Sequence, residues 1–433
     1  MKLFILSSLV FVIFFISFMC HGGIGNNNYN LIPIAGEATI YKKVADYNNS
    51  VNLIPHAGEP KIYGRIARSE MYGMFSDAGL LGFCNSSGTL PDNAKYKYSL
   101  SCYQNGTCKY YDLYESQTGL QALIYALLNK LYKNPIIFRT FCASFLSLVL
   151  TSWFVWLCGY FGFLTSLWIM LGILSFRGLM LFGDNIAHVL GASYLIMIAL
   201  FWAYKKKVKN VGTVTFFVLL LKLLLNGPEY LFSAFLLPFL PLVFYSVLYK
   251  MTSQRIKKDA LLITGGIVLA CLVALLILMI QISIARSLPE AIHHSINRVM
   301  ARTYFATPSS SFATKDVLKN ISLWQLLHLY LCFPCINIGW FQVSFKMIIL
   351  FFFTTSILTF YIYRCNQQRI LLALLVTTWA SILCPLSWIL IAKGHSAVHT
   401  YIDQFIWHMP FTLLGMALTI VTLHAYFKKW WPE

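Results

Sequence analysis

ALLITGGIVLACLVALLILMIQISI, residues 260–284, contains no charged side chain. A helix of about 20 mostly apolar residues is long enough to cross the hydrocarbon core of a bilayer, so this stretch predicts a transmembrane helix. Nine other stretches predict spans for the same reason, which gives ten in all. They are residues 3–20, 136–159, 161–176, 189–204, 211–225, 231–249, 347–363, 370–391 and 411–427.

The composition of the whole chain agrees with this pattern. Of its 433 residues, 58% are hydrophobic and 11% are charged, and the mean hydropathy is +0.67. Soluble globular proteins contain about 45–50% apolar and about 25% charged residues, so the composition excludes a soluble enzyme, a disordered chain and a disulfide-dense secreted module. We expect an all-α polytopic membrane protein with the lipid bilayer as a partner.

The net charge of +18 reflects where the cations lie, and we do not expect a nucleic-acid partner. The connections assigned to the inner side carry thirteen Lys and Arg residues but only two acids, Asp259 and Glu433. This bias follows the positive-inside rule and predicts that both termini are cytoplasmic. The membrane is then a bacterial inner membrane or, for a eukaryotic chain, that of the endoplasmic reticulum. The cations are Lys2, Lys205, Lys206, Lys207, Lys209, Lys250, Arg255, Lys257, Lys258, Arg364, Arg369, Lys428 and Lys429.

Ten spans with this orientation divide the chain into five parts. They are a signal-anchor helix (1–20), a large outer-face loop (21–135), a bundle (136–284), a second outer-face segment (285–346) and the C-terminal helices (347–433). The second outer segment includes the apolar stretch 323–341, which is interrupted by polar residues and proline. We interpret that stretch as an outer-face or re-entrant segment. If it crossed the membrane instead, the count of spans would be eleven.

The first outer-face loop holds eight of the fifteen acidic residues and a direct duplication. Residues 30–45 read NLIPIAGEATIYKKVA, and residues 52–67 read NLIPHAGEPKIYGRIA. In each copy Pro and Ala-Gly form a turn signal before a helix-like apolar period, which predicts two amphipathic helices on the membrane surface. Glu37 and Glu59 are then either helix-start residues, which the helix dipole favours, or carboxylates used in chemistry.

Residues 332–335, Cys-Phe-Pro-Cys, have the C-x-x-C spacing found in redox and zinc sites. A zinc site would need further ligands, and we find no second cysteine pair or nearby histidine to supply them. We therefore assign no redox or metal role to this pair.

Four stretches resemble, in the same order, the protein O-mannosyltransferase-like and aminoarabinose-transferase-like proteins of the GT-C glycosyltransferase superfamily. They are GEPKIYGRIARSEMYGMFSDAGLLG (58–82), LYKNPIIFRTFCASFLSLVL (131–150), Ser175-Phe-Arg177 followed by Asp184, and LKLLLNGPEYLFSAFLLPFLP (221–241). The resemblance implies a GT-C-like bundle and a polyprenyl-phosphate-linked sugar as donor. The chain departs from the family where Gly58 precedes Glu59 in place of an Asp-Glu pair, where residues 115–119 replace a Pro-Pro pair, and where Asn226 replaces a Lys.

Glycosyl transfer from such a donor needs a base for the acceptor proton and cations for the departing phosphate. Glu59 is the first candidate for the base, and Glu37 of the duplicate copy is its rival. Asp184 is another catalytic candidate, which either supports the site or holds a divalent cation through its oxygens. Arginine forks, lysines and histidines at outer helix ends suit the donor phosphate. These phosphate candidates are Arg139, Arg177, Lys393, His395 and His399.

We expect the candidates on the later outer connections to converge on one cavity beneath the first outer loop, with Glu59 above it. His395 and His399 are four residues apart, so they share one side of a helix. Glu229 follows Gly227 and Pro228 at the start of a predicted span, and we interpret it as a helix-start residue.

These features predict a membrane glycosyltransferase that moves a sugar to a lipid, glycan or protein acceptor at the outer face. Two other classes stay open: a lipid or polysaccharide transporter or flippase, and a non-catalytic membrane protein. A transporter would show ionisable residues in mid-span or broken helices in symmetric halves. Lys222 is the clearest charge within a span, whereas the acids are concentrated in the first outer loop, which favours the enzyme.

Overall fold

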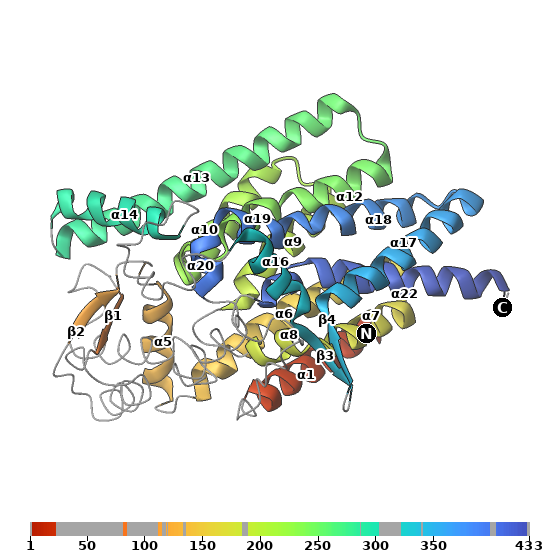
Figure 1. Ribbon diagram of the computed structural model, residues 1–433, viewed down its shortest axis with the longest axis horizontal. Coiled ribbons are helices and arrows are strands. Elements are labelled where there is room, and N and C mark those ends of the chain that lie inside the picture. The colour runs from red at the N-terminus through yellow and green to blue at the C-terminus, as the bar shows by residue number, and fades with distance from the viewer. Residues whose placement is uncertain are drawn as a thin grey trace.

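The structure is a computed structural model. It describes residues 2–22, 81–84, 111–114, 118, 120–132, 136–183, 189–285, 287–302, 322–338, 341–398 and 404–430. Within these residues the chain is mostly helical, and most of the helices lie side by side in one elongated bundle (Figure 1). Glu37, Glu59, Asp184 and His399, together with the two predicted amphipathic helices of the first loop, lie outside the described residues.

The helices of the first half are α1 (Lys2–Gly22), α5 (Leu120–Leu131), α6 (Ile136–Phe161), α7 (Phe163–Leu174), α8 (Arg177–Phe182), α9 (Leu190–Lys205), α10 (Val211–Asn226), α11 (Leu231–Leu236) and α12 (Phe239–Tyr249). Those of the second half are α13 (Ser253–Ala285), α14 (Leu288–Arg302), α16 (Leu323–Cys332), α17 (Phe345–Asn366), α18 (Arg369–Ser381), α19 (Leu383–Ile391), α20 (Lys393–Val398), the 3-10 helix η1 (Gln404–His408) and α22 (Phe411–Trp430). Two antiparallel hairpins complete the described structure: β1 (Leu81–Cys84) with β2 (Tyr111–Tyr114), and β3 (Pro334–Ile338) with β4 (Phe341–Ser344).

Within the described residues, five helical segments are long and apolar enough to cross a membrane. This finding confirms a helical membrane protein, since such segments satisfy their backbone hydrogen bonds internally. The segments are Ile137–Phe161, Leu231–Tyr249, Ser253–Ser283, Phe345–Asn366 and Arg369–Ile391. In the other predicted spans the described apolar helical segments have at most 17 residues. Helix α7, for example, has 12 residues, a rise of about 18 Å against a hydrocarbon core of about 30 Å. The count of ten spans therefore stays a prediction.

Two of the five segments are interrupted, and the interruptions face each other. Segment Leu231–Tyr249 is broken between α11 and α12, where Pro238 supplies no backbone N–H. Segment Arg369–Ile391 is broken at Ile382 between α18 and α19, close to Pro385. In the packed bundle α11 lies against α19 and α12 against α18, and the hydroxyl of Ser233 donates to the carbonyl oxygen of Cys384 at 2.7 Å.

The predicted inner connections lie together at one end of the bundle. The turns from α12 to α13 and from α17 to α18 share the end towards which the C-terminus points (Figure 1). Lys205, the last residue of α9, reaches the carboxyl end of α6, where its Nζ lies 3.5 Å from the carbonyl oxygen of Trp156. Tyr204 donates a hydrogen bond to Asp259 near the start of α13 at 3.2 Å, and Arg255 lies 4.0 Å from the same carboxylate. The cations thus cluster at one end, while the side of the membrane that this end faces stays a prediction.

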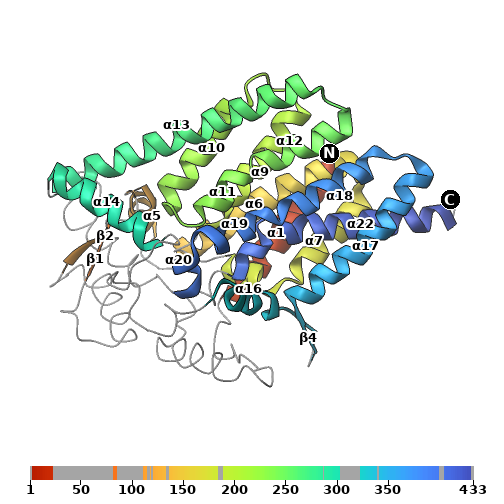
Figure 2. The same cartoon turned by 45° about the horizontal axis from the view of Figure 1, so that its top comes forward.

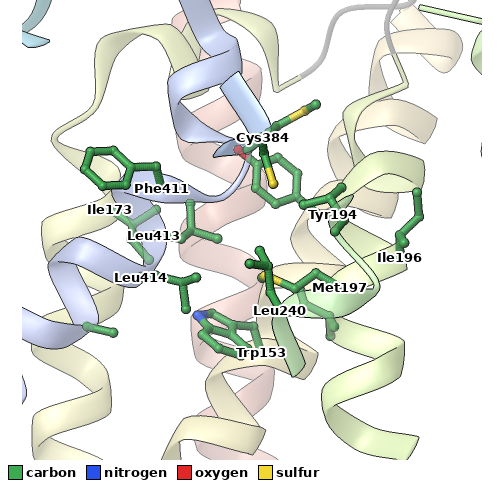
Figure 3. Packing of buried hydrophobic residues seen from close by; sticks show 14 of the residues in the cluster. Trp153, Ile173, Tyr194, Ile196, Met197, Leu240, Cys384, Phe411, Leu413 and Leu414 are labelled. Carbon is green, nitrogen blue, oxygen red and sulfur yellow. The ribbon is translucent and has the colours of Figure 1, made fainter. Parts of the chain in front are cut away.

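The core is continuous through the bundle. Figure 3 shows side chains from α6, α7, α9, α12, α19 and the start of α22 meeting around Trp153 and Met197. Trp153 and Trp156 stack with ring centroids 4.6 Å apart. Where α10 crosses α13 the backbones touch, because a Cβ added at Gly266 would collide with the carbonyl oxygen of Gly212. Small residues at helix crossings are the usual means of close packing within a bilayer.

The stretch 323–341 forms no long helix. It consists of the ten-residue α16 and strand β3, whose hairpin with β4 leads into α17. A capping box starts α16, because Ser322 accepts from the N–H of Gln325 while the Gln325 side chain accepts from the N–H of Ser322. This agrees with the interpretation of the stretch as something other than an eleventh span.

Candidate functional site

The turn between α10 and α11, residues 226–230, is the most polar buried feature at the end of the bundle opposite the basic connections. We call it the Gly227 turn. Gly227 and Tyr230 both have positive φ angles, 59° and 54°, so the chain reverses within a few residues. Glycine adopts this conformation without strain, whereas tyrosine requires its surroundings to hold it there.

Lys222 holds the Gly227 turn from inside α10. Its side chain is fully buried, and its Nζ donates to the carbonyl oxygens of Gly227, at 2.9 Å, and of Glu229. An ammonium group without water needs such acceptors, because burial of an unpaired charge is very costly. Glu229 itself is 6% exposed, so a cation and an acid are both buried within one short turn of the chain.

Asn226 joins the Gly227 turn to the start of α9. Its Oδ1 accepts from the N–H of Val189 at 3.2 Å, and its Nδ2 donates to the carbonyl oxygen of the same residue at 3.1 Å. Thr118, which precedes α5, donates to the carbonyl oxygen of Leu224 at 2.8 Å. These bonds therefore hold together three parts of the chain that are distant in sequence: Thr118, the end of α10 and the start of α9.

An apolar layer around the same point contains Phe138, the residue before Arg139. Arg139 lies in the first turn of α6 and is half-buried, and its neighbour Phe138 is fully buried. Side chains of α5 cover this layer, which links the beginnings of α6 and α9 with the end of α10. Its buried members are Phe138, Cys142, Val189, Ala192 and Leu225.

On its other side the Gly227 turn contacts α19. The rings of Tyr230 and Trp388 lie 4.9 Å apart, and α19 leads directly into α20, whose first residue is Lys393. Tyr330 of α16 donates to the carbonyl oxygen of Ser396 at 3.1 Å and so ties α20 to α16. Lys393 is half-buried and lies five residues after Trp388.

The structure does not join all the predicted phosphate ligands. Arg177 begins α8, which packs against α1, η1 and β3, whereas α20, with Lys393 and the backbone of His395, packs against α14, α16 and α19. Arg139 lies in the first turn of α6, next to Phe138 of the apolar layer. Asp184 falls between the buried residues Gly183 and Val189 but outside the described part. A common cavity for these residues therefore stays a prediction.

Two interpretations of the sequence require correction. Glu229 is not in the first turn of a helix, because α11 begins at Leu231 and Tyr230 occupies its N-cap. The statement that no histidine lies near the C-x-x-C pair is also wrong, since His328 Nε2 is 3.3 Å from the sulfur of Cys332. Cys335 turns away and donates to the carbonyl oxygen of Val343, and burial raises the pKa of this thiol to about 12.

A metal role is not supported by the described residues. No group of three His, Cys, Asp or Glu residues within them could hold a metal ion. His328 and Cys332 are four residues apart on α16 and supply only two ligands, whereas zinc usually takes four. A divalent cation at Asp184 is not tested, since that residue is outside the described part.

A second buried polar group, which the sequence analysis did not single out, lies at the start of α22. His408 is 1% exposed between the rings of Phe176 and Phe345, and its Nδ1 lies 2.9 Å from the hydroxyl of Thr412. Its Nε2 has no hydrogen-bond partner among the described residues. Burial lowers the pKa of His408 to about 3, so the imidazole is neutral at physiological pH. Tyr194 fixes the backbone here by donating to the carbonyl oxygen of His408 at 2.8 Å.

The fold and these buried polar groups define the chain as a helical membrane protein with a polar layer at one end. No protein family, curated protein or solved structure matches it. The resemblance to GT-C glycosyltransferases therefore stays an expectation that rests on the quoted motifs.

Proposed function

We propose that this chain is a membrane glycosyltransferase, which moves a sugar from a polyprenyl-phosphate-linked donor to a lipid, glycan or protein acceptor at the outer face. The observation that carries the proposal is the polar layer around the Gly227 turn. Lys222, Asn226 and Glu229 are buried there at the end of an apolar bundle, and Arg139 follows Phe138 of the adjoining apolar layer. A donor whose lipid tail stays in the bilayer needs polar and cationic groups at that depth.

The roles follow the chemistry of the transfer. The acceptor oxygen attacks the anomeric carbon, the bond from that carbon to the phosphate oxygen breaks, and the lipid phosphate leaves with the bonding electrons. Glu59 accepts the acceptor proton, with Glu37 as the alternative base, and Asp184 orients the site or holds a divalent cation. The leaving phosphate is held by cations among Arg139, Arg177, Lys393, His395 and His399.

The rigid frame around the Gly227 turn supports this assignment. Asn226 fixes Val189, which is the first described residue after Asp184, and Arg139 follows the buried Phe138 in the same layer. Catalytic groups need such support, because misplacement by about 1 Å costs much of the rate. The same frame also supplies a low-dielectric environment in which a cation binds phosphate more strongly than in water.

A direct assay tests the proposal. Purified protein in nanodiscs is incubated with polyprenyl-phosphate sugars and a set of lipid, glycan and peptide acceptors, and released polyprenyl phosphate is measured. Release that depends on both donor and acceptor is the expected result. Absence of release with every donor, from protein that keeps its thermal unfolding transition, would contradict the proposal.

A transporter is the second candidate, and one observation favours it. The paired interruptions, α11–α12 against α19–α18, resemble the discontinuous helices around which transporters bind their substrates. Vesicles that contain the protein would then take up a polyprenyl-phosphate sugar or a glycan without releasing lipid phosphate. The two assays together distinguish the classes.

A further inference from the structure

Helix α14 (Leu288–Arg302) follows the longest helix of the described structure and differs from it in character. Three of its apolar side chains, Leu288, Ile292 and Ile296, are four residues apart and therefore form one stripe along the helix. They are 55%, 43% and 57% exposed. A stripe of this kind in a water-facing position would be unfavourable, because aliphatic side chains that stay exposed forgo the stabilisation that transfer out of water provides.

Two other sides of α14 are defined by its described side chains. Ala291 is fully buried against Ile282 and Leu278 near the end of α13. On the far side His293 and Asn297, both exposed, lie within hydrogen-bond distance of each other at 3.2 Å. The apolar stripe thus lies between the packed side and the polar side, which is the arrangement of a helix at a membrane interface.

The length of α13 places α14 at the edge of the bilayer. The charged residues at the start of α13 end at Asp259, and residues 260–282 rise about 34 Å at 1.5 Å per residue, slightly more than a hydrocarbon core of about 30 Å. Ile282 is therefore at the boundary of the membrane, and Ala291 of α14 packs against it. Figure 2 shows α14 turning back from this end of α13 towards α20, with which it is in contact.

The preceding helix also carries a band of exposed apolar side chains, as expected for a helix that crosses a bilayer. Exposed apolar side chains run along α13 up to Ile280, which lies in sequence between Leu278 and Ile282, the two residues that pack against Ala291 of α14. The exposed side chains of the band are Leu261, Val268, Leu269, Leu272, Leu275, Leu276 and Ile280. If this band contacts lipid, a helix that begins at the membrane boundary beside it is expected to contact lipid too.

We propose that α14 is an interfacial helix that docks its Leu288–Ile292–Ile296 stripe into the lipid leaflet at the α20 end of the bundle. Phospholipid acyl chains cover the stripe, and His293 and Asn297 face the headgroups and water. Because α14 contacts α20, the docked helix holds Lys393 at the level of the headgroup phosphates. This inference needs only the membrane-spanning fold and is independent of glycosyl transfer.

Photocrosslinking in a bilayer tests the inference. The photoreactive residue p-benzoylphenylalanine replaces Ile292 in the full-length protein, and replaces Asn297 in a matched variant. Both are placed in phosphatidylcholine nanodiscs and irradiated, and tryptic peptides of α14 are analysed by mass spectrometry for phospholipid adducts. We expect several-fold more lipid adduct at position 292 than at position 297.

A second pair, Ile296 and His293, repeats the comparison on the neighbouring turn and covers the case in which one variant fails to assemble. Equal lipid adducts on both sides of the helix would overturn the proposal. So would crosslinks from the stripe to another segment of the chain or to a second copy, since the stripe would then be a protein contact.

Discussion

The side-chain amide of Asn226 bonds both backbone groups of Val189, accepting from its N–H at 3.2 Å and donating to its carbonyl oxygen at 3.1 Å. One side chain at the end of α10 thereby supplies the acceptor for the buried N–H of Val189 and a second donor to its carbonyl oxygen, which also accepts from the N–H of Ala192 at 3.0 Å. Leaving such an N–H unpaired costs about 1–3 kcal/mol, so the contact is both a brace and a constraint on where α9 begins.

Replacing Asn226 tests this brace. Asn226→Ala removes both bonds, and we expect the free energy of unfolding to fall by about 1–3 kcal/mol. Hydrogen exchange in peptides that cover the start of α9 should accelerate, because the Val189 amide loses its acceptor. Asn210→Ala is the matched control: Asn210 is an exposed N-cap that accepts from Thr213, and its loss should affect only the start of α10. Unchanged exchange near residue 189 would contradict the assigned role.

Lys222 is expected to stabilise the Gly227 turn. Lys222→Met keeps the length and apolar stem of the side chain but leaves the carbonyl oxygens of Gly227 and Glu229 without this donor. Each buried unsatisfied carbonyl costs about 1–3 kcal/mol, so the midpoint of thermal unfolding in detergent should drop clearly. Lys206→Met, at an exposed position, is the control. Equal midpoints for the two variants would mean that the ammonium group contributes nothing to the turn.

The orientation can be measured with a membrane-impermeant maleimide. In a background in which the exposed Cys365 and the first-loop residues Cys84, Cys102 and Cys108 are replaced by Ser, Asn297→Cys should react from outside intact cells. Lys209→Cys, in a basic connection, should react only after permeabilisation, because the cations are retained on the cytoplasmic side. The opposite pattern would reverse the assignment of both ends of the bundle.

The proposed base makes a prediction for the transfer assay. Glu59→Gln should lower turnover by about two to four orders of magnitude, the usual contribution of a general base, with little change in expression. Glu37→Gln should be much milder. Equal and small effects from the two substitutions would identify both residues as helix-start residues of the duplicated motif.

His408 makes the stability depend on pH. Burial depresses its pKa from an ordinary value of 6.5 to about 3, so below pH 6.5 the unfolded chain binds a proton that the folded chain does not. The stability is therefore complete above pH 6.5 and is lost as the pH falls towards 3, by at most about 1.4 kcal/mol per pH unit. His408→Gln should flatten this dependence. Thermal unfolding at pH 7.5, 6 and 5 measures the difference.

The sequence by itself determined the class of the protein and the position of most helices. Long apolar stretches such as 260–284 form helices in a bilayer, because their backbone polar groups must be hydrogen-bonded within the segment. The clustering of cations in short connections is also a property of neighbouring residues in the sequence, so it can be identified without a structure. The duplicated motif and its two Glu residues were found in the same way, although they lie outside the described residues.

Only the tertiary structure decided which polar residues are buried together. Lys222 was visible as a charge in an apolar stretch, but its acceptors are carbonyl oxygens, which every residue carries and no sequence pattern marks. The pairing of Asn226 with Val189 spans 37 residues and depends on how α9 packs against α10. Glu229 seemed a helix-start residue because the pattern gives the order of residues and not the backbone angles, which place Tyr230 at the N-cap instead. Burial and long-range hydrogen bonds are properties of packing, and packing is settled only when the helices meet.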